Sequence, residues 1–166
     1  MKIIFLLLAF LLTIISFGQN KEKAIKTIDS IVKVISKDKK YTTSYFRIQA
    51  LKKVLHYISY TYKFEKKNIL RIERKFSHKQ DSIKQIFYLN NGQLIYAIET
   101  IVSHFANDSI TWSGDFYFSN GKLLDYETLG HGKSEIETWD PESDILRSYS
   151  ESKRDIIRHQ KSKNFN

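Results

Sequence analysis

The sequence predicts an α+β domain: an N-terminal helix, an antiparallel meander of about six strands built from three hairpins, and a C-terminal helix. Three observations lead to this prediction. Apolar residues recur at helical spacing near both ends of the chain, and roughly every second residue is apolar through its middle. The dipeptides Asn91-Gly92 and Asn120-Gly121 each separate two apolar runs, which is the strongest short-range signal for a hairpin.

The N-terminal segment has the three parts of a secretion signal. Lys2 supplies a positive charge, an apolar run extends from Ile3 to Ile15, and Ser16-Phe17-Gly18 suits cleavage before Gln19. The run is shorter than the roughly 20 residues that span a bilayer. We expect residues 1–18 to be a cleavable signal peptide, so that the mature protein is periplasmic or secreted and meets the membrane only during export. An uncleaved anchor is the alternative.

We expect residues 19–160 to form one domain and residues 161–166 to be a flexible tail. The chain has no cysteine, so packing alone must hold an exported domain together. Without cysteine, thiolate chemistry and cysteine-based zinc sites are also excluded.

The first helix is predicted over residues 21–37, where apolar residues at helical spacing alternate with Lys and Asp. Residues 44–54 fit a short helical turn, although their aromatic residues also suit a strand. The last helix is predicted to begin at Pro141, after Asp140, and to end near His159, because Pro at the first helical position and an acid in the first turn are typical helix starts.

Strand periodicity begins at His56. Two-residue loops in the second and third hairpins, and a three-residue loop ending at Asn68 in the first, set the expected register. The expected pairs are Phe64–Leu70, Tyr62–Ile72, Ile58–Phe76, Leu89–Leu94, Phe87–Tyr96, Gln85–Ile98, Phe118–Leu123 and Phe116–Asp125. The face expected to pack under the helices carries Ile58, Tyr62, Phe64, Leu70, Ile72, Phe87, Leu89, Leu94, Tyr96, Ile98, Trp112, Phe116, Phe118 and Leu123.

Residues 87–94 and 116–123 repeat the pattern (F/Y)-Y-x-x-N-G-x-L. With the export signal and the single helix that precedes the strands, this pattern resembles small secreted proteins of Bacteroidota whose function is uncharacterised. The resemblance implies a fold and a compartment, and it implies no activity.

Charge is divided unevenly along the chain, whose formal net charge is +9. Residues 19–80 contain 17 Lys and Arg against 5 acids, whereas residues 99–144 contain 10 acids against Lys122 and Lys133. Opposite signs in the two halves suit a charge-complementary protein contact or an internally balanced surface. A nucleic-acid binder would more typically spread basic residues along one stripe, so nucleic acid is not an expected partner.

Signals for catalysis are weak. The chain has no nucleophile elbow, phosphate loop or HExxH motif, and its histidines are scattered, so we expect no cofactor and no metal. The expected register places Asp125 and Glu127 on the core face with His131 one loop away, which suggests a general acid/base cluster. In the alternative, an edge strand leaves the core there, so that both acids reach water and guard the edge against aggregation.

The second face of the sheet is the better candidate for a binding surface. If it is open, it brings together Tyr88, Tyr117 and Tyr126, with Asp115 and Glu99 among them. Cross-strand pairing of aromatic residues, or cover by the C-terminal helix, would explain the same residues without a ligand. In the same way, Asp140, Glu142 and Asp144 suit either calcium or a helix cap.

These observations favour an exported, non-enzymatic binding protein whose open sheet face contacts a peptide, protein or apolar ligand. The alternatives are a periplasmic inhibitor or immunity protein, and a hydrolase that uses Asp125, Glu127 and His131. A basic surface formed by residues 21–79, attached to anionic lipid or polysaccharide, is a further possibility.

Overall fold

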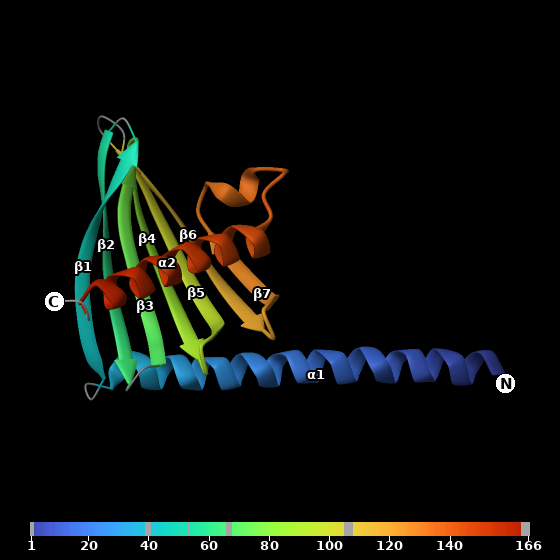
Figure 1. Cartoon of the computed structure of the whole chain (residues 1–166). Coiled ribbons are helices and arrows are strands. Elements are labelled where there is room, and N and C mark those ends of the chain that lie inside the picture. The colour runs from blue at the N-terminus through green and yellow to red at the C-terminus, as the bar shows by residue number, and fades with distance from the viewer. Residues whose placement is uncertain (1, 39–40, 53, 66–67, 105–107, 164–166) are drawn as a thin grey trace.

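Two helices lie on opposite faces of one antiparallel sheet in the computed structural model (Figure 1). The structure describes residues 2–38, 41–52, 54–65, 68–104 and 108–163, without the side chains of residues 2–19, 49–52, 54–57 and 163. The sheet has seven strands, each hydrogen-bonded to the next in the chain, so the expected α+β meander is confirmed with one additional strand. In order, the elements are α1 (Lys2–Lys37), β1 (Thr42–Lys52), β2 (Val54–Glu65), β3 (Asn68–His78), β4 (Asp81–Asn90), β5 (Gln93–His104), β6 (Ser109–Ser119), β7 (Lys122–Leu129), the short 3-10 helix η1 (Lys133–Glu135) and α2 (Pro141–Lys163).

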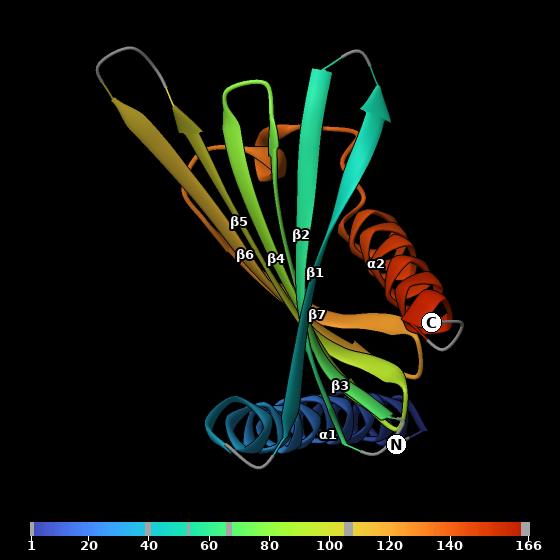
Figure 2. The ribbon, with the colours of Figure 1, turned by 60° about the vertical axis from the view of Figure 1, so that its left-hand side comes forward.

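Helix α1 crosses the sheet at the end where the β2–β3, β4–β5 and β6–β7 turns lie (Figure 2). Ile28 and Ile35 are buried two helical turns apart, because residues seven apart lie on the same face of a helix. Ile35 packs with Ile86 and Tyr88 of β4. We call this face of the sheet the α1 side, and it corresponds to the second face that the sequence left open.

Helix α2 covers the other face, which we call the α2 side. Its residues Ile145 and Ile156 are buried in the main core. Asp140 caps the helix by accepting hydrogen bonds from the backbone N–H and the hydroxyl of Ser143 at 3.2 and 2.6 Å. The predicted start at Pro141 is confirmed, whereas the helix continues past His159 into the segment expected to be a tail.

The expectation of a helical turn over residues 44–54 is wrong. This segment forms most of β1, which pairs with β2 without interruption from Thr42↔Phe64 to Lys52↔Val54. Phe46 points into the core and stacks on Tyr60 at a ring-centroid distance of 4.9 Å. Cross-strand pairing of aromatic residues therefore outweighs the weak helical spacing of the segment.

The register shifts by one residue near the turn of each of the β2–β3, β4–β5 and β6–β7 hairpins. The shifts lie between Lys63 and Phe64, between Tyr88 and Leu89, and between Tyr117 and Phe118, and each is the mark of a β-bulge. On the turn side of the bulges, the predicted pairs Leu89–Leu94 and Phe118–Leu123 are confirmed. In the first hairpin Tyr62–Ile72 is confirmed, but Phe64 pairs with Ile69 instead of Leu70.

Beyond the other two bulges, the predicted pairs are wrong by one residue. Phe87 faces Ala97 instead of Tyr96, Gln85 faces Glu99 instead of Ile98, and Phe116 faces Tyr126 instead of Asp125. Because a one-residue slip moves every later side chain to the other face, Tyr96, Ile98 and Asp125 lie on the α1 side. The main core on the α2 side contains Phe46, Tyr60, Tyr62, Ile72, Phe87, Leu89, Leu94, Ala97, Trp112, Phe116, Phe118, Ile145, Tyr149 and Ile156.

The packing of α1 predicts unequal effects of two neighbouring substitutions. Ile35 is 4% exposed and Val34 is 55% exposed. Ile35→Ala should lower the free energy of unfolding by roughly 2 to 5 kcal/mol, because it leaves a cavity against the sheet. Val34→Ala, the matched control, should change it by less than about 0.5 kcal/mol. Urea denaturation measures both values, and equal effects would show that α1 is not docked through this face.

Candidate functional site

The sheet extends well beyond α1. The half of its α1 side that lies far from the β2–β3, β4–β5 and β6–β7 turns is therefore not covered by either helix (Figure 2). Strand pairing places Ser59, Lys75, Lys84 and Thr100 side by side in one row across β2 to β5. The adjacent row, one step farther from α1, consists of Ser77, Ser82 and Val102 across β3 to β5. This open part of the sheet is therefore basic and rich in hydroxyl groups.

These two rows, with Phe76 and Ile83, line an open groove of about 420 Å³, which we call the lysine groove. Lys75 and Lys84 are direct cross-strand partners in it. Like charges directly opposite each other on a sheet are destabilising, unless a group of opposite sign neutralises them. The two lysines thus form the cationic part of the groove, to which an anion would be attracted.

The two lysines differ in their neighbours. Lys75 Nζ lies 2.8 Å from Oε1 of Glu73, and the other carboxylate oxygen, Oε2, accepts a hydrogen bond from Arg71 at 2.5 Å. Burial alone would raise the pKa of the Glu73 carboxyl, but its bonds to Lys75 and Arg71 outweigh burial and lower that pKa. Lys84 has no ion-pair or hydrogen-bond partner among the residues that the structure describes. Its ammonium group is therefore the free cation of the groove.

Three of the five predicted binding residues lie on the α1 side but at the covered end. Tyr88 and Tyr117 flank Tyr96 at ring-centroid distances of 5.9 and 4.8 Å. Tyr88 is 5% exposed and shares a 3.0 Å hydrogen bond with Ser36 of α1, and Tyr117 donates one to Asp29 at 3.1 Å. Tyr96 donates to Asp115, the third predicted residue.

The environment of Tyr96 and Tyr117 keeps these two side chains protonated. Burial, followed by the nearby Asp29 carboxylate, raises the pKa of Tyr117 to about 12. Burial and the hydrogen bond to Asp115 likewise raise the pKa of Tyr96 above its ordinary value. Tyr88, Tyr96 and Tyr117 therefore form part of the surface on which α1 packs, and they are not an open contact surface.

The other two predicted binding residues lie on the α2 side. The bulges reverse the faces of β5 and β7, so Tyr126 stacks on Phe116 at 6.2 Å and meets the edge of Trp139. Tyr126 is 44% exposed, whereas Glu99 is 1% exposed. The structure thus separates the predicted set into three locations.

Glu99 is the buried member of a partly exposed ion cluster that the sequence did not predict. Lys133 Nζ donates to Glu99 Oε2 and to Asp144 Oδ2, both at 2.7 Å. Gln85 donates to the second oxygen of Glu99 at 2.8 Å, and Arg147 donates to Asp144 at 2.7 Å. The cluster joins the segment after β7 to both the sheet and α2. Its only signal in the sequence was the presence of Lys133 as the single Lys or Arg among the acids of residues 125–144.

The charges of the cluster stabilise each other. Burial alone would lower the pKa of Lys133, but Glu99 and Asp144 outweigh burial and raise it. Burial alone would raise the pKa of Asp144, but Lys133, Trp139 and Arg147 lower it. A lysine held in its charged form between two carboxylates does not supply a nucleophile or a base, so the cluster is structural.

The predicted catalytic residues have separate partners. Asp125 forms an ion pair with Lys21 of α1 at 2.9 Å. Glu127 is exposed on the α1 side, directly opposite Asp115 on the neighbouring strand. His131 contacts Glu135 at 2.5 Å through Nδ1. The expected placement of both acids on the core face is wrong, because the bulge between Tyr117 and Phe118 turns them to the other side.

The acids at the start of α2 are engaged in protein contacts. Asp140 caps the helix, Glu142 accepts a 2.7 Å hydrogen bond from the backbone N–H of Leu123, and Asp144 binds Lys133. Among the described residues, no three His, Asp or Glu side chains are grouped so that they hold a metal ion. The helix-cap explanation of these acids therefore agrees with the structure.

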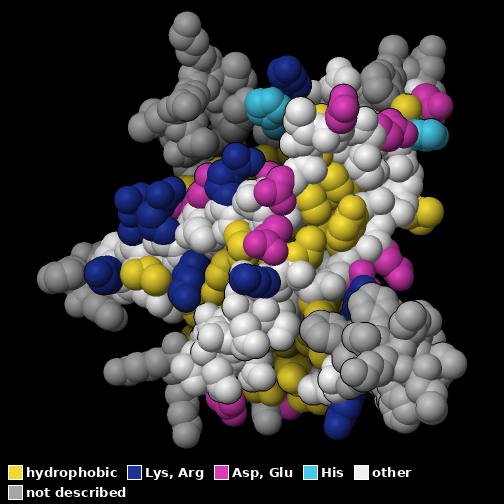
Figure 3. Space-filling view, turned by 90° about the vertical axis from the view of Figure 1, so that its right-hand side faces the viewer, with side chains coloured by type: hydrophobic (Ala, Val, Ile, Leu, Met, Phe, Trp, Pro, Cys, Tyr) yellow, Lys and Arg dark blue, Asp and Glu magenta, His cyan; other side chains and the backbone are white. Residues whose placement is uncertain are grey.

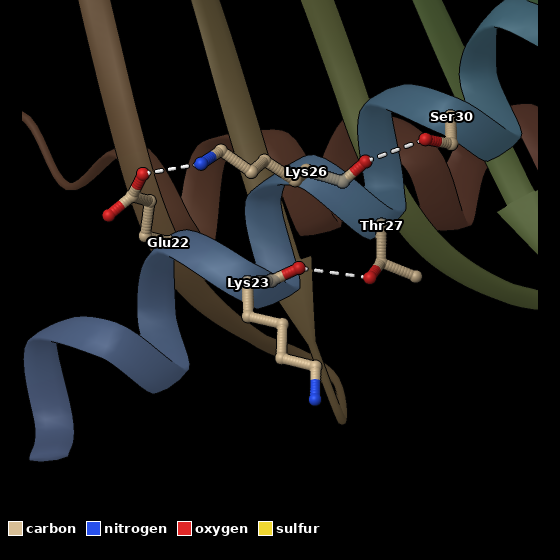
Figure 4. Close-up of a pocket in the computed structure, with 5 residues that line it drawn as sticks. All are labelled: Glu22, Lys23, Lys26, Thr27 and Ser30. Carbon is tan, nitrogen blue, oxygen red and sulfur yellow. Dashed lines mark hydrogen bonds and ion pairs between the residues drawn. The ribbon is translucent and has the colours of Figure 1, made fainter.

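A hollow on the outer surface of α1 lacks the features of a site (Figure 4). Lys26 pairs with Glu22 at 2.6 Å, and the hydroxyls of Thr27 and Ser30 donate to backbone carbonyls one turn earlier. These polar groups are satisfied within the helix and do not converge on a common point.

Comparison with protein-family models, with curated proteins and with solved structures found no match for this chain. No helix within the searched, described residues is both long and apolar enough to cross a membrane. The function must therefore be argued from the lysine groove and its surroundings.

The ion cluster predicts a pH-dependent effect of Lys133→Met. This variant leaves Glu99 buried without its cation and should lower the free energy of unfolding by about 3 kcal/mol. The difference in the free energy of unfolding between wild type and variant should be largest between pH 3.8 and 10.5. These are the ordinary pKa values of Asp144 and Lys133. The difference should shrink below this window as Asp144 is protonated, and above it as Lys133 is deprotonated in the wild type.

Unfolding in urea at several pH values measures this difference. The variant Lys133→Met/Glu99→Gln serves as the control, since it removes both members of the closest pair. It should recover part of the loss at neutral pH. A loss in Lys133→Met that does not vary with pH would contradict the ionic origin of the effect.

Proposed function

We propose that this protein is an exported, non-enzymatic binding protein whose lysine groove holds a segment of an acidic polysaccharide. The observation that carries the proposal is the direct pairing of Lys75 with Lys84 on an uncovered sheet face. Carboxylate or sulfate groups on such a polymer would neutralise Lys84 and give Lys75 a second partner beside Glu73.

The other groups of the groove suit a sugar polymer. Four hydroxyls line it, from Ser59, Ser77, Ser82 and Thr100, and a hydroxyl group both donates and accepts hydrogen bonds. The groove is open and runs across several strands, unlike the deep pockets that enclose small molecules. A polymer segment can lie across such a surface with both of its ends in solvent.

The distribution of charge supports the same proposal. Lys75 and one side of the lysine groove come from residues 19–80, the basic segment with 17 Lys and Arg against 5 acids. A field of one sign attracts polyanions and aligns them before close contact. The export signal expected at residues 1–18 would deliver the protein to the cell envelope, where charged polymers are exposed.

A hydrolase is less well supported than a binding protein. Asp125, Glu127 and His131 have separate neighbours, and Asp125 is paired with a lysine. General acid/base catalysis requires the acid and the base to reach the same bond. Among the described residues that line the groove there are lysines and hydroxyl groups but no carboxylate.

The proposal predicts a loss of polysaccharide binding in Lys75→Ala/Lys84→Ala. Heparin is the probe, and isothermal titration in about 0.1 M NaCl is the measurement. Charged hydrogen bonds contribute about 1.5 to 3 kcal/mol each, so affinity should fall by roughly tenfold or more. The control is Lys23→Ala/Lys122→Ala, which removes the same charge from exposed positions outside the groove and should retain binding.

Two further probes identify the source of the anion. Inorganic phosphate and vesicles of phosphatidylglycerol are titrated in parallel with heparin. Equal losses in both double variants would show that net charge alone is responsible, and the proposal would be wrong. Binding to the vesicles or to free phosphate without binding to heparin would also overturn it.

A further inference from the structure

A histidine lies at the end of the lysine groove that is farther from α1. The hydroxyl of Ser82, which lines the groove, is 3.1 Å from Nε2 of His104 and shares a hydrogen bond with it. His104 follows Val102, another lining residue, by two positions on β5, so both side chains lie on the α1 side. The hydrogen bond holds the exposed imidazole ring next to the groove.

The charged groups around His104 come from three segments. Strand β4 contributes Lys84, which lies two residues from Ser82 on the same face. The β3–β4 turn contributes Lys79, because the next residue, Gln80, accepts the backbone N–H of His104 at 3.0 Å. Two cations therefore lie on the segments beside the ring.

The third segment, at the start of β6, contributes an acid. Ser109 is the direct strand partner of His104, and the Asp108 carboxylate accepts the backbone N–H of Ser109 at 2.7 Å. Asp81 lies on the α2 side, as does its strand partner His78, because side chains alternate along β4 and β3. Among the described residues at this end of the sheet, His104 is therefore the histidine on the same face as the lysine groove.

Protonation of His104 would change two groups together. Histidine ordinarily gains or loses its charge between about pH 5 and 8. A neutral ring has one nitrogen that donates and one that accepts, whereas both nitrogens of a protonated ring donate. Nε2 of a protonated His104 therefore donates to the Ser82 oxygen, which frees the Ser82 hydroxyl hydrogen to point into the groove. Protonation thus adds a positive charge beside the groove and a hydrogen-bond donor within it.

We propose that His104 is a further cationic contact of the lysine groove, which makes the groove bind acidic polymers more tightly at mildly acidic pH. The inference rests on the proposed polysaccharide binding and adds a pH dependence to it. Lys84 follows Ser82 toward α1, and His104 lies on the other side of Ser82, so an anionic group at Ser82 meets both cations. Because coupling between two binding events is reciprocal, a bound polyanion should in turn favour the protonated ring.

The pH dependence of heparin affinity is the first test. The sulfate groups of heparin stay ionised between about pH 5 and 8, so a change in affinity reports on the protein. Isothermal titration in about 0.1 M NaCl should give an affinity about two- to fivefold higher at about pH 5.5 than at about pH 8, the effect of an exposed ion pair. His104→Gln keeps a side chain that can hydrogen-bond but cannot gain a charge, and it should lose most of this rise.

Another histidine supplies the control. Exposed histidine side chains lie at separate places on the side of the molecule shown in Figure 3. His131 is exposed in the segment after β7, where it contacts Glu135 at 2.5 Å and does not line the groove. His131→Gln removes the same type of titrating group and should keep the rise in affinity. An equal loss of the rise in both variants would show that net charge is responsible, and it would overturn the proposal.

Proton uptake is a readout that a merely structural role of His104 would not change. Titrations at about pH 6.5 in two buffers of different ionisation enthalpy measure the protons taken up when heparin binds. Wild type and His131→Gln should take up a fraction of a proton, and His104→Gln should take up less. The wild-type values test the proposal even without a variant, because binding without proton uptake would contradict it.

The outcomes separate this inference from the proposed function. Heparin binding that depends on Lys75 and Lys84 but not on pH would overturn the role of His104 and leave the groove as the binding site. A rise at mildly acidic pH that His104→Gln retains would do the same, once far-ultraviolet circular dichroism confirms a folded sheet. Absence of heparin binding at both pH values would overturn the proposed function and this inference together.

Discussion

The architecture depends on one extra residue in the second strand of each of three hairpins. Each β-bulge lies close to its turn, and together they place Leu70, Ile95 and Tyr96 against α1. Bulges increase the local right-handed twist and bend the bulged strand. At the end of the sheet with the β2–β3, β4–β5 and β6–β7 turns, the result is a surface that a straight helix can cross. The rest of the sheet diverges from the helix and stays open (Figure 2).

The same bulges explain where prediction from the sequence succeeded and where it failed. Alternating apolar residues and the Asn-Gly turns were sufficient for the meander and for the pairs nearest those two turns, and helical spacing was sufficient for the two helices. A bulge has no clear signature in residue type, so pairing was extrapolated through it and Tyr96, Ile98 and Asp125 were assigned to the wrong face. The strand β1 was missed because its pairing with β2 depends on contacts with Tyr60 that local spacing does not reveal.

The candidate site was less predictable than the fold for a different reason. Tyr88 and Tyr117 share a face of the sheet, as the sequence predicted. Whether that face is open depends on where α1 docks. The docking is decided by Ile35 and its neighbours and by hydrogen bonds such as that between Ser36 and Tyr88. The pairing of Lys75 with Lys84 follows from strand register and was within reach of the sequence, because the β3–β4 connection contains no bulge. Lysines on exposed strands are common, so their residue type alone does not indicate a site.

The strict order of the sheet has a consequence for how the chain acquires its structure. Every strand pairs with the strand that precedes it, so each new pairing closes only a short loop and the entropy lost at each step is small. A chain that emerges from its N-terminus, from a ribosome or a membrane pore, can extend the sheet one strand at a time. Helix α2 and Lys133 emerge last, so until then Glu99 remains hydrated and the apolar α2 side lacks its cover. Completion of the core therefore waits for the final part of the chain, and a truncated chain would expose the same surface that the finished protein buries.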